Sequence, residues 1–246
     1  MQEMPKVGQT VSIMNIDFLN KTKADFLEEC LYPRLQQEKK SFIVTANPEI
    51  VMNAREDAGY KKIVQTADYI VPDGAGILLA AKIMKQPLQE RIAGSDLMID
   101  LLTFAEAQGL SCYFLGAEQG VNDQAVREAL KRFPRLKIAG HHHGYFSDDD
   151  QVAEAVQQSR PDIILVALGF PRQEKWIAKH IDGFDKGLFI GVGGSLDILA
   201  GKVKRAPDKW IKYNLEWLYR ILQQPFRVKR IFKVFEFMLR IVFRRR

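Results

Sequence analysis

The chain of 246 residues is 47% hydrophobic and carries a formal net charge of +6, which leaves enough apolar material for one sizeable core. We expect no secretory signal, since residues 1–10 lack an apolar segment, and no stretch approaches the roughly 18 uninterrupted apolar residues of a membrane-spanning helix. The two cysteines, Cys30 and Cys112, are too few for a disulfide framework or a zinc site and fit reduced thiols in a cytosolic protein.

Short apolar runs alternate along the chain with segments of helical periodicity. The first two predicted elements are a strand at residues 11–16 and an amphipathic helix at residues 21–37. Further strands are predicted at residues 42–46, 69–71, 111–115, 136–139, 163–168 and 187–192. Further helices are predicted at residues 48–58, 75–85, 95–108, 122–133 and 148–158. This alternation, without hairpin dipeptides, predicts an α/β, Rossmann-like fold whose mostly parallel sheet is flanked by helices on both faces.

The segments that follow the predicted strands are rich in glycine. Ligands of parallel sheets bind beyond the carboxyl ends of the strands, so these segments are the expected binding site. Gly116, Gly169, Gly193 and Gly194 lie there, and glycine lets backbone amides approach a phosphate closely. A phosphate-bearing ligand is therefore favoured, although the chain has no P-loop motif and no complete dinucleotide fingerprint.

Asp73 is the strongest catalytic candidate, because it follows an apolar strand and stands between Pro72 and Gly74, where the chain must turn. A carboxylate in this position can act as a general base toward a hydroxyl nucleophile. It can equally cap the helix that begins near Gly74. The residues alone leave both interpretations open.

Four other polar residues are candidates for the site, and three of them have a second interpretation. Arg91 is either a clamp for a phosphate or an ordinary surface arginine. Gln173 and Glu174 open a helix after a glycine turn and can both face the site, or Glu174 can pair with a basic neighbour on the surface. Asp197 can bind a ribose or sugar hydroxyl, or cap its own turn.

Two clusters suggest metal ligands, but neither predicts a metal site. Residues 148–150 are three aspartates in a row, which is the composition of a helix N-terminus favoured by the helix dipole. Residues 141–143 are three adjacent histidines, which cannot easily converge on one ion. We expect the histidine segment to be a loop that lines a pocket.

The end of the chain differs in charge from the rest. Residues 202–246 contain 14 Lys and Arg against three acids, a charge of +11, so residues 1–201 sum to −5. We therefore predict a catalytic domain at residues 1–201 and a basic appendage at residues 202–246. Residues 202–224 are typical of a helix that packs on another element.

Beyond Pro225, apolar residues recur at spacings of three and four among basic residues. The stripe consists of Val228, Ile231, Phe232, Phe235, Met238, Leu239 and Val242. This pattern predicts an amphipathic helix that lies on an anionic membrane surface. Packing of the helix on the body or on another subunit is the alternative. The stripe is too apolar for a surface that tracks nucleic acid.

Eight segments, in the same order along the chain, resemble the WecG/TagA/CpsF family of glycosyltransferases between about residue 10 and about residue 230. They are TANPE (45–49), VPDG (71–74), ERIAGSD (90–96), FLG (114–116), HHGYF (142–146), ALGFPRQEKW (167–176), GVGGS (191–195) and GKVKRAP (201–207). One departure is Ala46, where many relatives have proline.

The resemblance implies an inverting transferase most like the Gram-positive members of the family. Such an enzyme moves N-acetylmannosamine from UDP-N-acetylmannosamine (UDP-ManNAc) to the 4-hydroxyl of N-acetylglucosamine (GlcNAc) on undecaprenyl diphosphate, in assembly of the wall teichoic acid linkage unit. No metal or other cofactor is implied. Another UDP-sugar, carrying N-acetylmannosaminuronic acid or glucose, is one alternative, and a non-catalytic membrane adaptor is the other. A homo-oligomer stays open.

The resemblance also assigns roles to residues. Asp73 matches the proposed general base of the family. Positions lining the sugar-nucleotide pocket match Thr45, Asn47, Arg91 and Gln173, and the strand-end argument adds Gly169, Gly193, Gly194 and Asp197. Arginines thought to meet the acceptor diphosphate match Arg220, Arg227 and Arg230. The expected location is cytoplasmic, peripheral on the inner face of the cell membrane.

Overall fold

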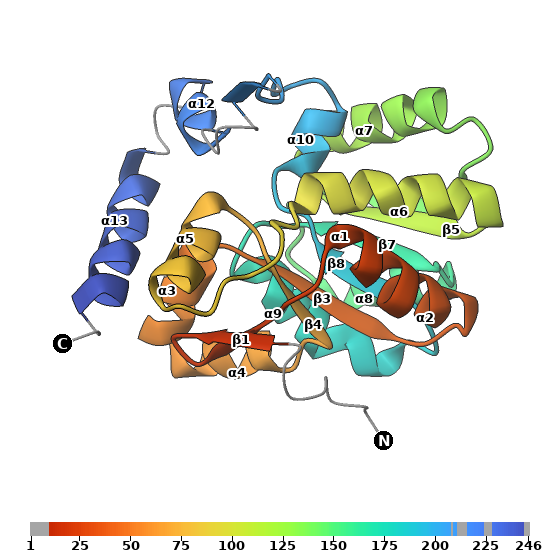
Figure 1. Ribbon diagram of the computed structural model, residues 1–246. Coiled ribbons are helices and arrows are strands. Elements are labelled where there is room, and N and C mark those ends of the chain that lie inside the picture. The colour runs from red at the N-terminus through yellow and green to blue at the C-terminus, as the bar shows by residue number, and fades with distance from the viewer. Residues whose placement is uncertain (1–9, 208, 211–215, 224–227, 244–246) are drawn as a thin grey trace.

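A six-stranded parallel sheet with the order β4-β3-β8-β7-β5-β6 forms the centre of the protein (Figure 1). The computed structural model describes residues 10–207, 209–210, 216–223 and 228–243. The strands are β3 (Ser41–Ala46), β4 (Tyr69–Pro72), β5 (Ser111–Gly116), β6 (Lys137–His142), β7 (Ile163–Ala167) and β8 (Leu188–Gly191). The predicted α/β, Rossmann-like architecture is confirmed.

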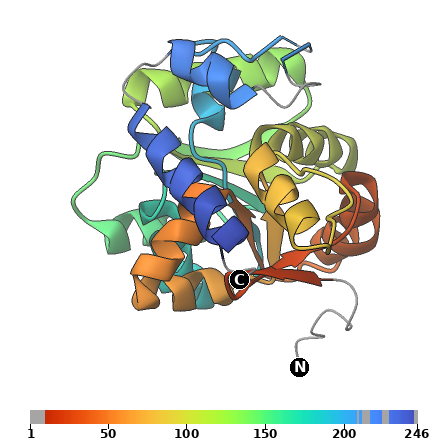
Figure 2. The same cartoon turned by 60° about the vertical axis from the view of Figure 1, so that its left-hand side comes forward.

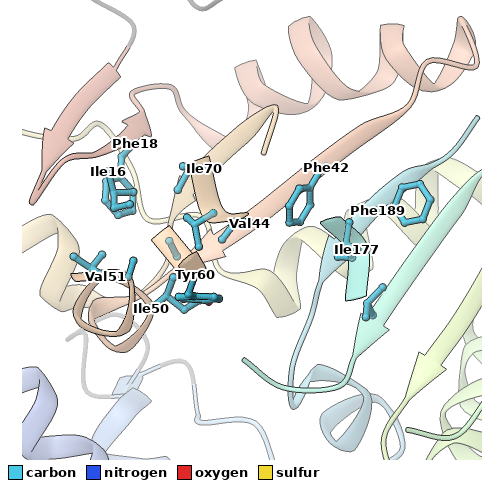
Figure 3. Close-up of a cluster of buried hydrophobic side chains, with 14 of the residues drawn as sticks. Ile16, Phe18, Phe42, Val44, Ile50, Val51, Tyr60, Ile70, Ile177 and Phe189 are labelled. Atoms are coloured by element: carbon cyan, nitrogen blue, oxygen red, sulfur yellow. The ribbon is translucent and has the colours of Figure 1, made fainter. Parts of the chain in front are cut away.

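Helices cover both faces of this sheet. The first face carries α3 (Pro48–Glu56), α4 (Ala58–Gln65), α5 (Ala75–Ile83), α8 (Asp149–Gln158) and α9 (Arg172–His180). The second carries α2 (Tyr32–Gln36), α6 (Gly94–Gln108), α7 (Gln119–Arg132) and α10 (Ser195–Leu199). Because both faces are covered, β3, β7 and β8 are buried along their whole length and read as continuous apolar runs. Figure 3 shows part of the apolar cluster on the first face.

The connections place a topological switch point at β8. The helices after β3 and β7 pack on the first face, whereas α10, which follows β8, packs on the second face. In parallel sheets, ligands bind where neighbouring connections part in this way, outside the carboxyl ends of the strands. The ends of β3, β8 and β7 are therefore the place where this fold can hold a substrate.

The structure differs from the predicted elements at the N-terminus. The segment expected as one strand is a hairpin of β1 (Thr10–Ile13) and β2 (Ile16–Leu19). Its turn residues, Met14 and Asn15, both have positive φ values, 51° and 65°, as a two-residue turn of this kind requires. The predicted helix at residues 21–37 consists of α1 (Lys23–Asp25), a π-helical segment (Phe26–Leu31) and α2.

Elsewhere in the chain, a short 3₁₀ helix (Ile181–Gly183) follows α9.

The basic C-terminal segment contributes α12 (Glu216–Gln223) and α13 (Val228–Phe243). The prediction of one helix at residues 202–224 is wrong for residues 202–207, which form a bend and irregular chain, and residues 208, 211–215 and 224 lie outside the described residues. Within the described part of the chain, no helix combines the length and the apolar character needed to cross a membrane. Figures 1 and 2 show α13 lying against α3 and α5.

Helix α13 has two apolar faces. Phe237 and Ile241 are buried in the same cluster as α3 and α5, and the Nζ of Lys233 lies 2.8 Å from the Oε2 of Glu56 on α3. The opposite face, made of members of the predicted stripe, stays exposed. Its residues are Phe232, Phe235, Leu239 and Val242. The helix therefore packs on the body, which was the alternative to a membrane-bound helix. It still presents most of the predicted stripe to solvent.

These two faces predict opposite effects for two phenylalanines on the same helix. Phe237→Ala should destabilise the docked helix by about 3 kcal/mol, because a fully buried ring is lost from the core. Phe235, which is 63% exposed, is the matched control, and Phe235→Ala should leave stability nearly unchanged. Denaturant unfolding and limited proteolysis of α13 measure both, and equal effects of the two variants would contradict this packing.

Candidate active site

Asp73 lies in the turn between β4 and α5. Its backbone N–H donates to the carbonyl oxygen of Ala46 at 3.0 Å, which ties this turn to the end of β3. The N-cap residue of α5 is Gly74, with a φ of +88°, and the helix has no side-chain cap. The helix-cap interpretation of Asp73 is therefore wrong, and its carboxylate contacts Arg91 instead.

Arg91 bridges two carboxylates from distant parts of the chain. Its Nε donates to the Oδ1 of Asp73 at 3.3 Å, and its Nη2 donates to the Oε2 of Glu216 on α12 at 2.7 Å. The side chain is only 17% exposed, so it is not the ordinary surface arginine that the sequence allowed. Burial lowers the pKa of Arg91, but the carboxylates of Asp73 and Glu216 outweigh burial and raise it, so the guanidinium stays charged.

Asn47 stands beside the Asp73 turn as the N-cap of α3. Its side-chain oxygen accepts from the backbone N–H groups of Glu49 at 2.9 Å and Ile50 at 3.1 Å. A Cβ placed on Gly74 would lie 3.9 Å from the Cβ of Asn47, which puts the two turns in contact. Because the oxygen serves the cap, the amide NH₂ is the end of Asn47 that can serve a ligand.

Thr45 and Gln173 are buried and hold the connection between β8 and α10. The Oγ1 of Thr45 donates to the carbonyl oxygen of Gly191 at 3.2 Å. The Oε1 of Gln173 accepts from the backbone N–H of Gly193 at 3.1 Å. In this structure both side chains therefore shape the turn at the end of β8. Direct contact of either one with a donor stays a prediction.

The glycine turns that the sequence singled out border the same region. Gly193 has a φ of +48°, and Gly194 is the N-cap of α10. Gly169 has a φ of +74°, and a Cβ added there would meet no atom within 4 Å, so its backbone adjoins open space. Asp197 lies in the first turn of α10, where its carbonyl oxygen accepts from the N–H of Val203 at 3.1 Å.

The structure thus gathers the predicted residues into two adjoining groups. Asp73, Arg91 and Asn47 surround the ends of β4 and β3, and Thr45 and Gln173 surround the end of β8. Strand β3 joins the groups because it contains Thr45 and leads directly into Asn47. Thr45 also lies against the start of α6, three residues after Arg91, since a Cβ on Gly94 would lie 3.1 Å from the Oγ1 of Thr45.

The three arginines expected to meet an acceptor lie in the basic appendage. Arg220 is in α12 and Arg230 is in α13, but neither side chain is among those described, and Arg227 lies outside the described residues. Their role stays a prediction. Glu216 was not among the predicted site residues, although the sequence holds one signal for it: Glu216 is one of only three acids in a segment with 14 basic residues.

The two clusters considered for a metal have other partners. The Oδ1 of Asp148 accepts from the N–H groups of Asp150 and Gln151, which confirms the predicted helix N-terminus. His141 and His142 lie in β6, so the expected loop is wrong for these two residues, and the Nδ1 of His141 lies 3.0 Å from the Oδ1 of Asn122. Across the chain as far as the structure describes it, no three His, Cys, Asp or Glu side chains are grouped as metal ligands.

A cavity of about 370 Å³ lies between α6, α7 and α10, next to the glycine turn at the start of α10, since Ser195 lines it. None of the predicted site residues lines it. Its walls combine apolar side chains of α6 and α10 with Lys131, Arg132 and Arg205. We assign the chemistry to Asp73 and its neighbours because the only predicted general base lies there.

The sequence is similar to known proteins of one family. Residues 11–246 match the family described as "Glycosyl transferase WecG/TagA/CpsF family". A protein of Bacillus spizizenii is 39% identical over 226 residues, covering 92% of this chain and 88% of the relative. A protein of Bacillus subtilis is 36% identical over 95% of this chain and 91% of its own length. A protein of Staphylococcus aureus is 39% identical over 94% and 91%.

All three relatives carry the name N-acetylglucosaminyldiphosphoundecaprenol N-acetyl-beta-D-mannosaminyltransferase. The family match covers the described fold, the site around Asp73 and the appendage. This confirms the resemblance read from the eight sequence segments: the chain belongs to the WecG/TagA/CpsF family of glycosyl transferases.

Proposed function

We propose that the protein is an inverting glycosyltransferase. It moves N-acetylmannosamine from UDP-ManNAc to GlcNAc carried on undecaprenyl diphosphate, with a β-1,4 linkage, in synthesis of the wall teichoic acid linkage unit. The names of relatives that are 36–39% identical over most of this chain support the acceptor and the sugar. The observation that carries the chemistry is the carboxylate of Asp73, presented at the end of β4 and bound to Arg91 rather than to a helix end.

In this mechanism Asp73 takes the proton of the acceptor 4-hydroxyl as that oxygen attacks the anomeric carbon. The new C–O bond forms on the face opposite the leaving group, so the anomeric configuration inverts. The bond between the anomeric carbon and the phosphate oxygen breaks, and its electron pair leaves with UDP. The side chain of Asp73 is partly exposed, so an acceptor can reach it.

The charge that develops on UDP needs stabilisation by fixed donors. Backbone amides at the Gly169 turn and at Gly194 lie at the strand ends, where they are proposed to serve this purpose, and Arg91 lies beside Asp73. Arg220, Arg227 and Arg230 are proposed to meet the acceptor diphosphate. These groups supply the charge stabilisation in this proposal without a cofactor.

The appendage is proposed to place the enzyme on the membrane that holds the lipid acceptor. Helix α13 presents Phe232, Phe235 and Val242 to solvent beside basic residues such as Lys233. An apolar face flanked by cations suits the interface of an anionic membrane. The expected location is the inner face of the cell membrane, as a peripheral protein.

The donor sugar is the part of this proposal with an alternative, which is a UDP-sugar that carries N-acetylmannosaminuronic acid or glucose. Purified protein should be assayed with a short-chain, water-dispersible lipid-linked GlcNAc acceptor and a panel of UDP-sugars. We expect turnover with UDP-ManNAc to exceed turnover with the other donors. Preference for a uronic acid or glucose donor would change the sugar, and no turnover with any donor would favour a membrane adaptor.

Asp73→Asn should lower kcat by roughly 10² to 10⁴, because a general base acts on the chemical step, while UDP affinity stays nearly unchanged. Asp148→Asn is the matched control: it makes the same change at a helix cap, where asparagine serves equally well. Steady-state kinetics and UDP titration measure both variants. Near-normal turnover of Asp73→Asn would remove Asp73 from the mechanism.

Glu216→Gln should lower kcat roughly tenfold, because Arg91 loses a charge-assisted hydrogen bond and is left to Asp73 alone. The carboxylate of Asp73 then faces an unshared positive charge and becomes a weaker base. Glu236→Gln provides the control, since Glu236 pairs with Arg240 on the exposed side of α13. Equal kinetics for both variants would show that the bridge to α12 is not part of the site.

Replacing Phe232 and Phe235 together by serine should weaken binding to anionic vesicles without lowering activity on the soluble acceptor. These residues are exposed, whereas cutting off α13 would also remove the buried Phe237. Binding to the vesicles, measured by sedimentation, should also weaken as salt rises. The loss of binding free energy should be about 1 kcal/mol for each screened Lys or Arg. If the double variant sediments like the unaltered protein, another surface meets the membrane.

A further inference from the structure

Glu174, in the first turn of α9, is a carboxylate buried in the body of the protein. It is only 1% exposed, and no described Lys or Arg lies within ion-pair distance of it. The expected surface pairing with a basic neighbour is therefore wrong. Burial raises the pKa of Glu174 above its usual range, against the hydrogen bonds that it accepts from Gln173 and Tyr60. A buried charge without a cation costs stability, so its presence calls for another explanation.

Both oxygens of this carboxylate are used. Oε1 accepts from the Nε2 of Gln173 at 2.7 Å, and Oε2 accepts from the hydroxyl of Tyr60 at 3.1 Å. Tyr60, on α4, is fully buried, and Figure 3 shows it beside Ile50 in the apolar cluster of the first face. The carboxylate is therefore held on its core side by the hydroxyl of Tyr60, whose ring is packed in the core.

The contact with Glu174 decides which way round the carboxamide of Gln173 lies. In the observed orientation, its NH₂ group donates to Glu174 and its oxygen accepts from the N–H of Gly193. A 180° flip would set the oxygen against a carboxylate and the NH₂ against another N–H group. Both contacts would then be repulsive, so the carboxylate enforces one orientation.

This carboxamide lies directly against the end of β8. A Cβ added to Gly191 would come within 2.5 Å of the Nε2 of Gln173, so the close approach depends on glycine there. Two residues later, the N–H of Gly193 points at the Oε1 of Gln173 while its backbone adopts a positive φ. A chain of hydrogen bonds thus runs from α4 through α9 to the turn that begins α10, at the switch point of the sheet.

We propose that Glu174 is a positioning residue for the donor. Its carboxylate, held by Tyr60, orients Gln173, and Gln173 fixes the Gly193 turn against which the donor diphosphate binds. The identity of the donor as a UDP-sugar rests on the function proposed above. The ordering of the turn does not, because it is a property of the protein alone.

Glu174→Gln tests this directly, since it keeps the shape and removes the charge. We expect the KM for the donor to rise roughly tenfold, about the loss of one hydrogen bond, with kcat and the acceptor KM nearly unchanged. Thermal stability should change little, because the amide keeps the packing and the charge that it removes was itself costly to bury. Glu154→Gln, on the exposed face of α8, is the charge-matched control. An unchanged donor KM in Glu174→Gln would overturn the proposal.

Amide hydrogen exchange of Gly193, measured without any ligand, gives a second readout. Exchange should be faster in Glu174→Gln than in the unaltered protein. Hydrogen exchange should slow again in the double variant Gln173→Glu with Glu174→Gln, in which the two residues are swapped. There the carboxylate at position 173 accepts from the N–H of Gly193, and the amide at position 174 lies between that carboxylate and Tyr60. Unchanged exchange in Glu174→Gln, or no recovery in the pair, would contradict the relay.

A milder variant keeps the test decisive if Glu174→Gln does not fold. Tyr60→Phe retains the packed ring and removes only the hydroxyl that donates to Glu174. It should therefore speed the hydrogen exchange of Gly193 by a smaller factor than Glu174→Gln does. No change in that variant would then overturn the proposal. Failure of the unaltered protein to use UDP-sugars would contradict the proposed function and would leave the exchange result to stand by itself.

Discussion

The double contact of Arg91 is the interaction on which the rest of the site depends. One guanidinium binds the predicted general base, Asp73, and a carboxylate of the appendage, Glu216. Its charge is stabilised by both partners, and the loop that carries it is tied to the end of β4 through the N–H of Ile92 and the carbonyl oxygen of Pro72. The body of the protein and the basic C-terminal segment therefore meet at the point where chemistry is proposed, and α12 contributes directly to the surroundings of Asp73.

Packing extends this connection beyond α12. Helix α13 rests on α3 and α5, which are the helices that begin next to Asn47 and Asp73. Its buried Phe237 and its exposed Phe235 lie on opposite faces, so one helix contacts the core and also presents an apolar surface outward. A membrane contact through the exposed face would thus act on a segment that touches the elements holding the site.

The sequence predicted what depends on local pattern. Apolar runs located the buried strands, and the rule that parallel strands end at one edge brought Asp73, Asn47 and Gln173 to one region from the pattern alone. Local pattern in the sequence could not reveal the role of Glu216, which contacts Arg91 from 125 residues away along the chain. Nor could it show that Glu174 is buried, because its neighbours in the chain are basic and suggest a surface. The hairpin at Met14 was missed because methionine is a rare residue for a positive φ.

The link that Arg91 forms between the base and the appendage is tested most directly by a double-mutant cycle between Arg91→Lys and Glu216→Gln, measured on kcat/KM. If the two side chains act through one bridge, their effects are not additive, and a coupling free energy of about 0.5–3 kcal/mol is expected. Additive effects, with a coupling near zero, would show that Glu216 does not act through Arg91 and would contradict the bridge as the basis of the site.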